Sequence, residues 1–211
     1  MDPGRPLSTI TVAELVARVE ASPARLGAVR LVCIDGPAGS GKTTLAGRLA
    51  GALGDVATVV HLEDLYAGWS MTGAVGRLEA GVLRPLAEGR AGAHHRYDWA
   101  AERFAPQPTP VPVRPVLLVE GCGSSPRRLD RWTSLRIWVE APAELRVARG
   151  LARDGAELAP QWRRWQTTEA AEFAREDTRM RADLRLDSAA ASPAGAFVSL
   201  QGTAPGTTAG T

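Results

Sequence analysis

The segment from Gly36 to Thr43 limits the folds open to this chain more than any other feature. It reads Gly-Pro-Ala-Gly-Ser-Gly-Lys-Thr and matches the pattern G-x-x-x-x-G-K-[ST] at every fixed position. The run 29–34 before it is mostly apolar, as in a buried strand. The stretch after it, from about 43 to 53, has apolar residues at helical spacing. A strand, a glycine-rich turn and a helix in this order predict one unit of a parallel α/β sheet.

The glycine-rich segment also predicts phosphate binding. Its glycines allow backbone N–H groups to turn inward around phosphate oxygens, and the following helix adds its positive N-terminal end. We expect Lys42 to bridge the β- and γ-phosphates of ATP and the Thr43 hydroxyl to bind Mg²⁺. An ordinary glycine-rich turn between a strand and a helix is the simpler alternative. The residues expected to bind the nucleotide are Gly36, Ala38, Gly39, Ser40, Gly41, Lys42, Thr43 and Thr44.

The basic residues of the chain support a special role for Lys42. Of the 25 basic residues, Lys42 is the only lysine and all the others are arginine. In a chain that otherwise uses arginine throughout, one lysine indicates a position that needs a compact ammonium group, because a planar guanidinium does not imitate it.

The remaining apolar runs predict the rest of the sheet. With 29–34, the runs 58–62, 116–119, 135–139 and 184–186 make five strands, and helical patterns alternate with them. The expected fold is a three-layer α/β P-loop NTPase fold with a mostly parallel five-stranded sheet, helices on both faces and a small lid. Further helical patterns cover 74–88, 143–153 and 161–176, and the proline-rich stretch 89–115 predicts a loop or small hairpin.

The chain divides into three expected parts. Residues 1–28 form an N-terminal helical extension, in which a helix over 9–21 begins with a capping box of Thr11 and Glu14. Residues 29–187 form the P-loop kinase domain, with a lid at about 154–164. Residues 188–211 are rich in small residues and predict a flexible, low-complexity tail, although 196–200 could add an edge strand.

Charge and composition limit the classes of binding partner that we expect. The net charge of +2 does not indicate a nucleic-acid or membrane partner. No apolar run reaches the roughly 18 residues that span a bilayer, and the first residues carry no export signal, so we expect a cytoplasmic protein. Cys33 and Cys122 lie in or beside apolar runs and fit buried free thiols. The partner we expect is a small molecule, and a homo-oligomer is compatible with the sequence.

Two acidic residues that follow strands complete a candidate site for phosphoryl transfer. Asp64, beyond the strand 58–62, is placed to accept the proton of an attacking hydroxyl group, although a solvated loop charge is the alternative. Glu120 ends the strand 116–119, where a carboxylate would hold Mg²⁺. With Lys42 as the only lysine, the Asn-Lys-x-Asp motif of switch GTPases cannot occur, and no Leu-Ser-Gly-Gly signature is present. The kinase group remains.

Three arginines share one face of the helix 143–153. Arg146, Arg149 and Arg153 recur at spacings of three and four residues. Their guanidinium groups could neutralise charge on a transferred phosphoryl group, or they could form a solvated helix face.

On these segments the sequence resembles the uridine kinase-like branch of P-loop kinases, which includes phosphoribulokinase and pantothenate kinase. The resemblance covers roughly 29–187 and rests on the P-loop, the segment 63–66, Tyr97-Asp98-Trp99, Val119-Glu120-Gly121, Arg149 to Asp154, and Ala182-Asp183. It implies that Asp64 is the base, that Glu120 and Thr43 serve Mg²⁺, and that Arg149 and Arg153 are catalytic lid arginines beside Lys42. The acceptor residues that it implies are Asp64, Tyr66, Tyr97, Asp98 and Trp99.

The sequence departs from this family in two places. Ala100-Ala101-Glu102-Arg103 stands where uridine kinases have a His-Ser-Arg-like run, and Arg103 could replace its arginine. The Glu-Arg-Gly sequence of the lid is also missing. Phosphoryl transfer to a hydroxyl group is the leading hypothesis. The alternatives are a kinase for a different small alcohol (a sugar, a vitamin precursor or an antibiotic) and a nucleotide-sensing protein without transfer activity. Trp69 and Trp99 each follow an acceptor segment and could stack on a base.

Overall fold

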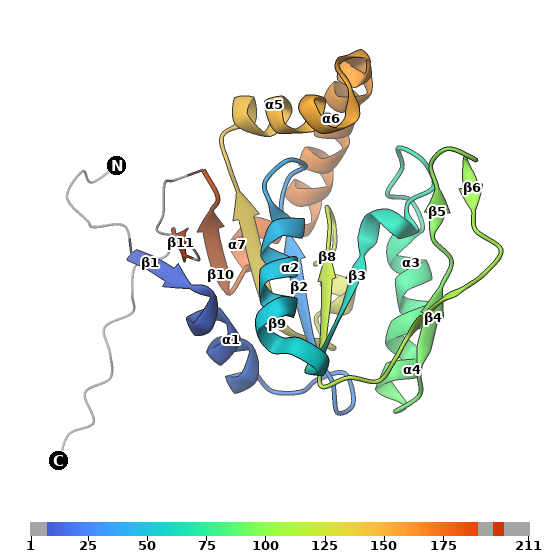
Figure 1. Ribbon diagram of the computed structural model, residues 1–211, viewed down its shortest axis with the longest axis vertical. Coiled ribbons are helices and arrows are strands. Elements are labelled where there is room, and N and C mark those ends of the chain that lie inside the picture. The colour runs from blue at the N-terminus through green and yellow to red at the C-terminus, as the bar shows by residue number, and fades with distance from the viewer. Residues whose placement is uncertain (1–7, 190–195, 201–211) are drawn as a thin grey trace.

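The computed structural model describes residues 8–189 and 196–200, and these form one main sheet with helices on both faces (Figure 1). Five of its strands are parallel: β2 (Arg30–Asp35), β3 (Ala57–His61), β8 (Val116–Glu120), β9 (Thr133–Glu140) and β10 (Leu184–Asp187). All five were predicted from their apolar runs. The parallel α/β architecture is therefore confirmed.

The predicted strand count was wrong, because the sheet has seven strands in the order β1-β11-β10-β9-β2-β8-β3. The two additional strands are β1 (Ser8–Thr11) and β11 (Ala196–Ser199), of which β11 falls in the stretch 196–200 expected as a possible further strand. They pair antiparallel with each other, and β11 also pairs antiparallel with β10. Residues 8–11 had been assigned in part to a helix. Their strand depends on a partner at the other end of the chain, which local spacing does not reveal.

Helices α1 (Val12–Ala21) and α2 (Lys42–Leu53) cover one face of the sheet. Thr11 caps α1, and its hydroxyl and backbone N–H both contact Glu14 as the capping box predicts. Leu15 and Val19 pack with Val32 and Ile34 of β2 in one apolar cluster. Residues 1–7, 190–195 and 201–211, which belong to the expected N-terminal extension and tail, lie outside the described residues.

The other face of β2 presents Leu31 and Cys33 to a second apolar cluster. It is covered by α3 (Ala74–Leu78), a π-helical turn (Glu79–Leu83) and α4 (Arg84–Ala87), which together fill the helix predicted over 74–88. The predicted irregular region contains β4 (Gly92–His94) paired with β7 (Thr109–Val111), and β5 (Tyr97–Asp98) paired with β6 (Arg103–Phe104).

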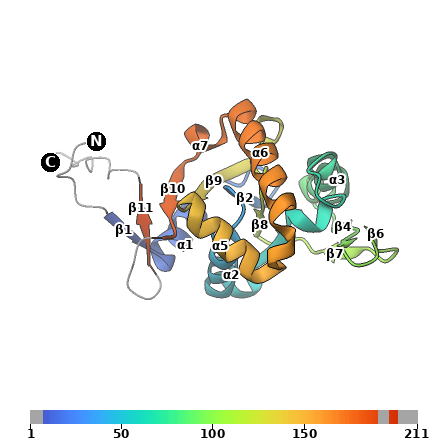
Figure 2. The ribbon, with the colours of Figure 1, turned by 90° about the horizontal axis from the view of Figure 1, so that it is seen from above.

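Helices α5 (Ala143–Asp154) and α6 (Ala159–Glu176) lie across the carboxyl ends of the parallel strands (Figures 1 and 2). A short 3₁₀ turn (Ala156–Leu158) joins them, so the stretch expected as a lid, 154–164, consists of this turn and the start of α6. Helix α7 (Thr178–Arg181) then leads into β10. Among the described residues, no helix is both long and apolar enough to cross a bilayer.

Candidate active site

The candidate site lies at the carboxyl ends of three neighbouring strands. The P-loop follows β2, Asp64 follows β3, and Glu120 is the last residue of β8. Because parallel strands end at the same edge of a sheet, this topology brings together residues far apart in the sequence. Gly121 follows β8 and has a backbone φ of +143°. A Cβ atom at this position would lie 2.7 Å from Leu62 Cβ, so only glycine fits there.

The P-loop is packed tightly beneath α5. Gly39 has φ +77°, and a Cβ atom at this position would lie 2.4 Å from the carbonyl oxygen of Arg146. Ser40 is buried, and its hydroxyl has no hydrogen-bond partner among the described residues. Lys42, Thr43 and Thr44 form the start of α2. The backbone of the loop is therefore held in a fixed shape, as phosphate binding requires.

Lys42 is almost fully buried, and its Nζ donates to the Pro37 carbonyl at 2.9 Å. Burial by itself lowers the pKa of this ammonium group. The neighbouring groups Cys122, Glu120, Asp35 and Glu169, in that order, outweigh that effect and raise the pKa above its ordinary value. The side chain is charged at neutral pH and fits a phosphate partner.

The two residues expected to hold Mg²⁺ touch each other. The Thr43 hydroxyl donates to Glu120 Oε1 at 3.1 Å, and Glu120 is buried. A hydroxyl and a carboxylate are hard oxygen ligands of the kind that Mg²⁺ takes, so this pair fits the ion. Since no cluster of three or more potential ligand side chains occurs in the described part of the chain, water and phosphate oxygens would complete the coordination shell.

Sequence reasoning missed His61, the last residue of β3. Its Nδ1 lies 2.6 Å from Glu120 Oε1, and this contact is the main reason that the His61 pKa is raised, with burial opposing it. The residue orients the Glu120 carboxylate from the neighbouring strand. Its position at the end of a predicted strand was the available signal.

Asp64 lies in a 3₁₀ turn (Leu62–Leu65) directly after β3, and its side chain is mostly buried. Its Oδ1 forms an ion pair with Arg96 Nε at a distance of 3.1 Å. Arg96 precedes β5 and was not predicted as a site residue. Next to Asp64, burial and then the charge of Glu120 raise the Glu63 pKa. Asp64, which Arg96 holds in place, stays the candidate base of this turn.

The predicted acceptor aromatics belong to a continuous chain of ring contacts. Tyr66 packs on Trp165 with ring centroids 5.1 Å apart, and Trp165 packs on Trp69 at 6.0 Å. Trp69 contacts Trp99 at 5.8 Å, and Trp99 contacts Tyr97 at 5.4 Å. We refer to Tyr66, Trp165, Trp69, Trp99 and Tyr97 as the aromatic chain. Trp69 and Trp99 are exposed, so a ligand can reach them.

The other predicted acceptor residues have different surroundings. The Tyr66 hydroxyl is buried and donates to the Cys122 carbonyl at 2.7 Å, so it supports the loop after β8. Asp98 Oδ1 accepts from the N–H groups of Ala100 and Ala101 and closes the turn of the β5–β6 hairpin. Arg103 is exposed and lies opposite Asp98 in the hairpin register.

Two of the three arginines on α5 contact the P-loop. Arg146 Nη1 donates to the Ala38 carbonyl at 3.3 Å, and Arg149 Nη1 donates to the Gly39 carbonyl at 3.4 Å and to Ser188 Oγ at 3.2 Å. Arg153 pairs instead with its neighbour Asp154, at 2.6 Å between Nε and Oδ1. Arg146, for which a solvated helix face was an equal alternative, is the least exposed of the three.

Two buried acidic residues that the sequence reasoning did not select also hold this region. Asp35 accepts the N–H groups of Gly36, Gly123 and Ser125 at 2.7–2.9 Å, and burial raises its pKa to about 6. Glu169 of α6 accepts the Ala38 N–H through Oε2 at 2.8 Å. Asp35 ties the P-loop to the loop after β8, and Glu169 ties it to α6.

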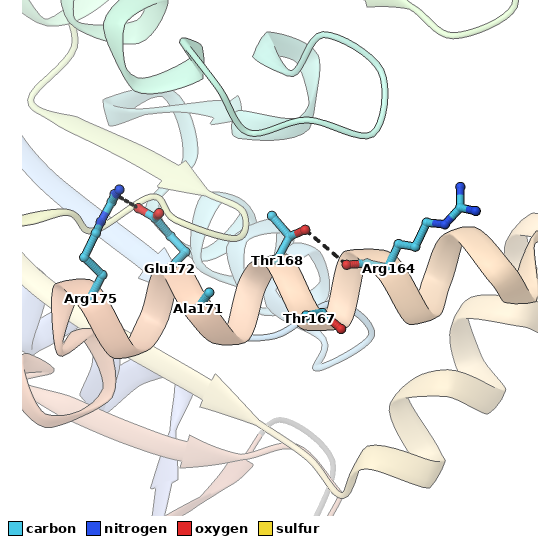
Figure 3. A pocket seen from close by; sticks show the side chains of 6 residues that line it. All are labelled: Arg164, Thr167, Thr168, Ala171, Glu172 and Arg175. Carbon is cyan, nitrogen blue, oxygen red and sulfur yellow. Dashed lines mark hydrogen bonds and ion pairs between the residues drawn. The ribbon is translucent and has the colours of Figure 1, made fainter.

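A hollow of about 610 Å³ lies along one side of α6. Figure 3 shows its lining, which consists of Arg164, Thr167, Thr168, Ala171, Glu172 and Arg175. Thr168 donates to the Arg164 carbonyl and Arg175 pairs with Glu172. No predicted site residue lines it. The hollow borders the site only where Glu172 approaches Gly123.

Comparisons with known proteins agree with this geometry at the level of the fold. No family model and no curated protein matches the chain. The solved structure of a "Possible Uridine Kinase" from Bacillus stearothermophilus matches with a TM-score of 0.61 and 20% identity, over 82% of this chain and 96% of that one. A "putative fructose transport system kinase" from Silicibacter sp. TM1040 matches with a TM-score of 0.58 and 23% identity, over 83% and 98%. The chain has the α/β P-loop kinase fold of these two proteins, the fold predicted from its sequence.

Proposed function

We propose that this protein is an ATP-dependent kinase that transfers the γ-phosphoryl group of Mg-ATP to a hydroxyl group of a small molecule. One observation carries the proposal: a buried lysine in a complete P-loop, a Thr43–Glu120 oxygen pair and the carboxylate of Asp64 converge at one edge of the sheet. A protein that only binds ATP has no need of a carboxylate base beside its phosphate loop.

Each part has a role in the transfer. The P-loop N–H groups and Lys42 bind the phosphates, and Arg149 contacts the loop from α5. Thr43 and Glu120 would hold Mg²⁺, and the bound ion would neutralise negative charge on the phosphates. Asp64 accepts the proton of the acceptor hydroxyl. The hydroxyl oxygen forms a bond to the γ-phosphorus, the bond to the β–γ bridging oxygen breaks, and ADP leaves with the electron pair.

We further propose that the acceptor carries a flat ring, as a nucleoside does. The exposed rings of Trp69 and Trp99 within the aromatic chain offer stacking surfaces to an acceptor. The name of the Bacillus stearothermophilus structure agrees with a nucleoside acceptor, whereas the name of the Silicibacter structure favours a sugar. Tyr97, Asp98 and Arg103 belong to the hairpin that would contact such an acceptor.

The experiment is ADP release from Mg-ATP with matched acceptors. Nucleosides are compared with the sugars they contain, and Asp64→Asn serves as the control. ADP release that a nucleoside stimulates, that its sugar stimulates less, and that the variant lacks supports both parts of the proposal. Stimulation by sugars alone would support the kinase proposal and contradict the proposal that the acceptor carries a flat ring. If no alcohol in either set stimulates ADP release, the kinase proposal fails.

A further inference from the structure

Glu169 is a carboxylate on the buried face of α6. It shares that face with Trp162, Trp165 and the partly buried Phe173, and its side chain is 3% exposed. A buried carboxylate is costly unless charged or N–H partners surround it. The partners of Glu169 therefore indicate why it is there.

All polar partners of Glu169 belong to the phosphate loop or to residues that touch it. Oε2 accepts the Ala38 N–H at 2.8 Å and lies 3.4 Å from Cys122 Sγ, which is itself 3.5 Å from Lys42 Nζ. Oε1 is 3.2 Å from Arg146 Nη1. The negative charge of Glu169 also contributes to the raised pKa of Lys42. A loop N–H, a guanidinium and a nearby ammonium are the partners that an oxygen of a phosphate takes.

We propose that Glu169 competes with the γ-phosphate for the Ala38 N–H and makes the loop discriminate ATP from ADP. This inference rests on the proposed function. Two anions cannot share the Ala38 N–H, so a γ-phosphate that enters the loop displaces the Glu169 carboxylate. ADP lacks the third phosphate and leaves the contact intact.

The displacement changes the partner of Arg146. Its Nη1 is held by the Ala38 carbonyl and by Glu169. When Glu169 leaves, Arg146 can contact the γ-phosphate instead, which makes it the arginine of α5 best placed for the transferred group. Helix α6 carries Trp162 and Trp165 on the same face as Glu169, so these indoles report the movement.

The test compares the binding of ADP and of the non-hydrolysable β,γ-imido analogue of ATP by titration calorimetry. In Glu169→Gln we expect the analogue to bind about tenfold tighter than in the wild type, the size of one charge-assisted contact. ADP affinity should stay within about twofold. Glu172→Gln, which changes the carboxylate one turn further along the same helix that pairs with Arg175, is the matched control and should change neither affinity.

Equal or weaker binding of the analogue by Glu169→Gln would overturn the inference, because Glu169 would then support the loop rather than compete for it. If that variant does not fold, tryptophan emission of the wild type decides. The analogue should shift the emission and ADP should not, and Trp165→Phe should reduce the shift. Identical spectra with both nucleotides would overturn the inference while leaving the kinase intact. A wild type that binds neither nucleotide would remove the proposed function together with it.

Discussion

The Asp64 carboxylate and the Arg96 guanidinium form an ion pair, with 3.1 Å between Oδ1 and Nε. The arginine is largely exposed whereas the carboxylate is not. A carboxylate that accepts a proton during transfer must be available to the acceptor hydroxyl. Arg96 therefore orients Asp64 through one oxygen and leaves the carboxylate open to the hydroxyl group. The two residues should differ strongly in their effect on the rate.

Replacement of Asp64 by Asn should lower kcat by about 100-fold to 10,000-fold, the contribution of a positioned base, with ATP affinity unchanged. Arg96→Gln should cost less than about tenfold, because a largely exposed ion pair contributes little. Steady-state kinetics together with titration calorimetry of ATP measure both effects. Comparable losses in the two variants would contradict the assignment of Asp64 as the base.

The Thr43–Glu120 contact predicts coupled effects on the metal. Thr43→Val and Glu120→Gln should each raise the Mg²⁺ concentration needed for half-maximal activity. The double variant should lose less than the sum of the two single losses, because both side chains serve one ion. A magnesium titration of activity for the four proteins of the cycle measures this. Strict additivity would indicate that the two residues act independently.

Much of the fold could be predicted because each central strand is a short apolar run and the P-loop marks where β2 ends. Strand β1 could not be predicted, because buried Ile10 stands between the exposed Thr9 and Thr11 and the partner strand β11 lies at the other end of the chain. The same physical limit applies at the site. Asp64 and Glu120 lie at the carboxyl ends of apolar strands, so a parallel sheet places both at the same edge.

Glu169 illustrates what local patterns do not provide. Its partner Ala38 lies 131 positions earlier, and a carboxylate in an arginine-rich helix normally faces water. The one local sign was its position on the same helical face as Trp162, Trp165 and Phe173. Arg96 offers no such sign, because its partner depends on how the segment before the β5–β6 hairpin packs against the turn after β3.

The exposed tryptophans predict a change in acceptor affinity. Trp69→Ala and Trp99→Ala should each raise the acceptor KM by about fivefold to tenfold, the size of one lost ring contact, and leave kcat and the ATP KM nearly unchanged. Met180→Ala, at another exposed apolar side chain far along the chain, is the control. A fall in kcat with no change in acceptor KM would argue against stacking.

An ion pair away from the site predicts a pH-dependent stability. Arg179 donates to both Glu140 oxygens, at 2.6 and 2.9 Å, and this contact is the main cause of the lowered Glu140 pKa. An acid with a lowered pKa adds stability above its unfolded pKa, and this stability is lost as pH falls through the folded value. Arg179→Gln should therefore lower the free energy of unfolding at pH 7 by about 1 kcal/mol, a small effect because the ion pair is partly exposed. The difference should disappear in acid below both values, as urea titrations across pH would measure.

Replacing the only lysine of the chain tests whether the phosphate site requires an ammonium group at this position. Lys42 fits between the Pro37 carbonyl and Cys122 Sγ in a site that leaves it 7% exposed, and a guanidinium is larger and planar. We expect Lys42→Arg to weaken ATP binding by at least about tenfold and to abolish measurable transfer, although the charge is kept. Arg48→Lys makes the reverse exchange on the exposed side of the same helix and should leave both unchanged. If Lys42→Arg retained normal turnover, the single lysine would reflect composition rather than the shape of the phosphate site.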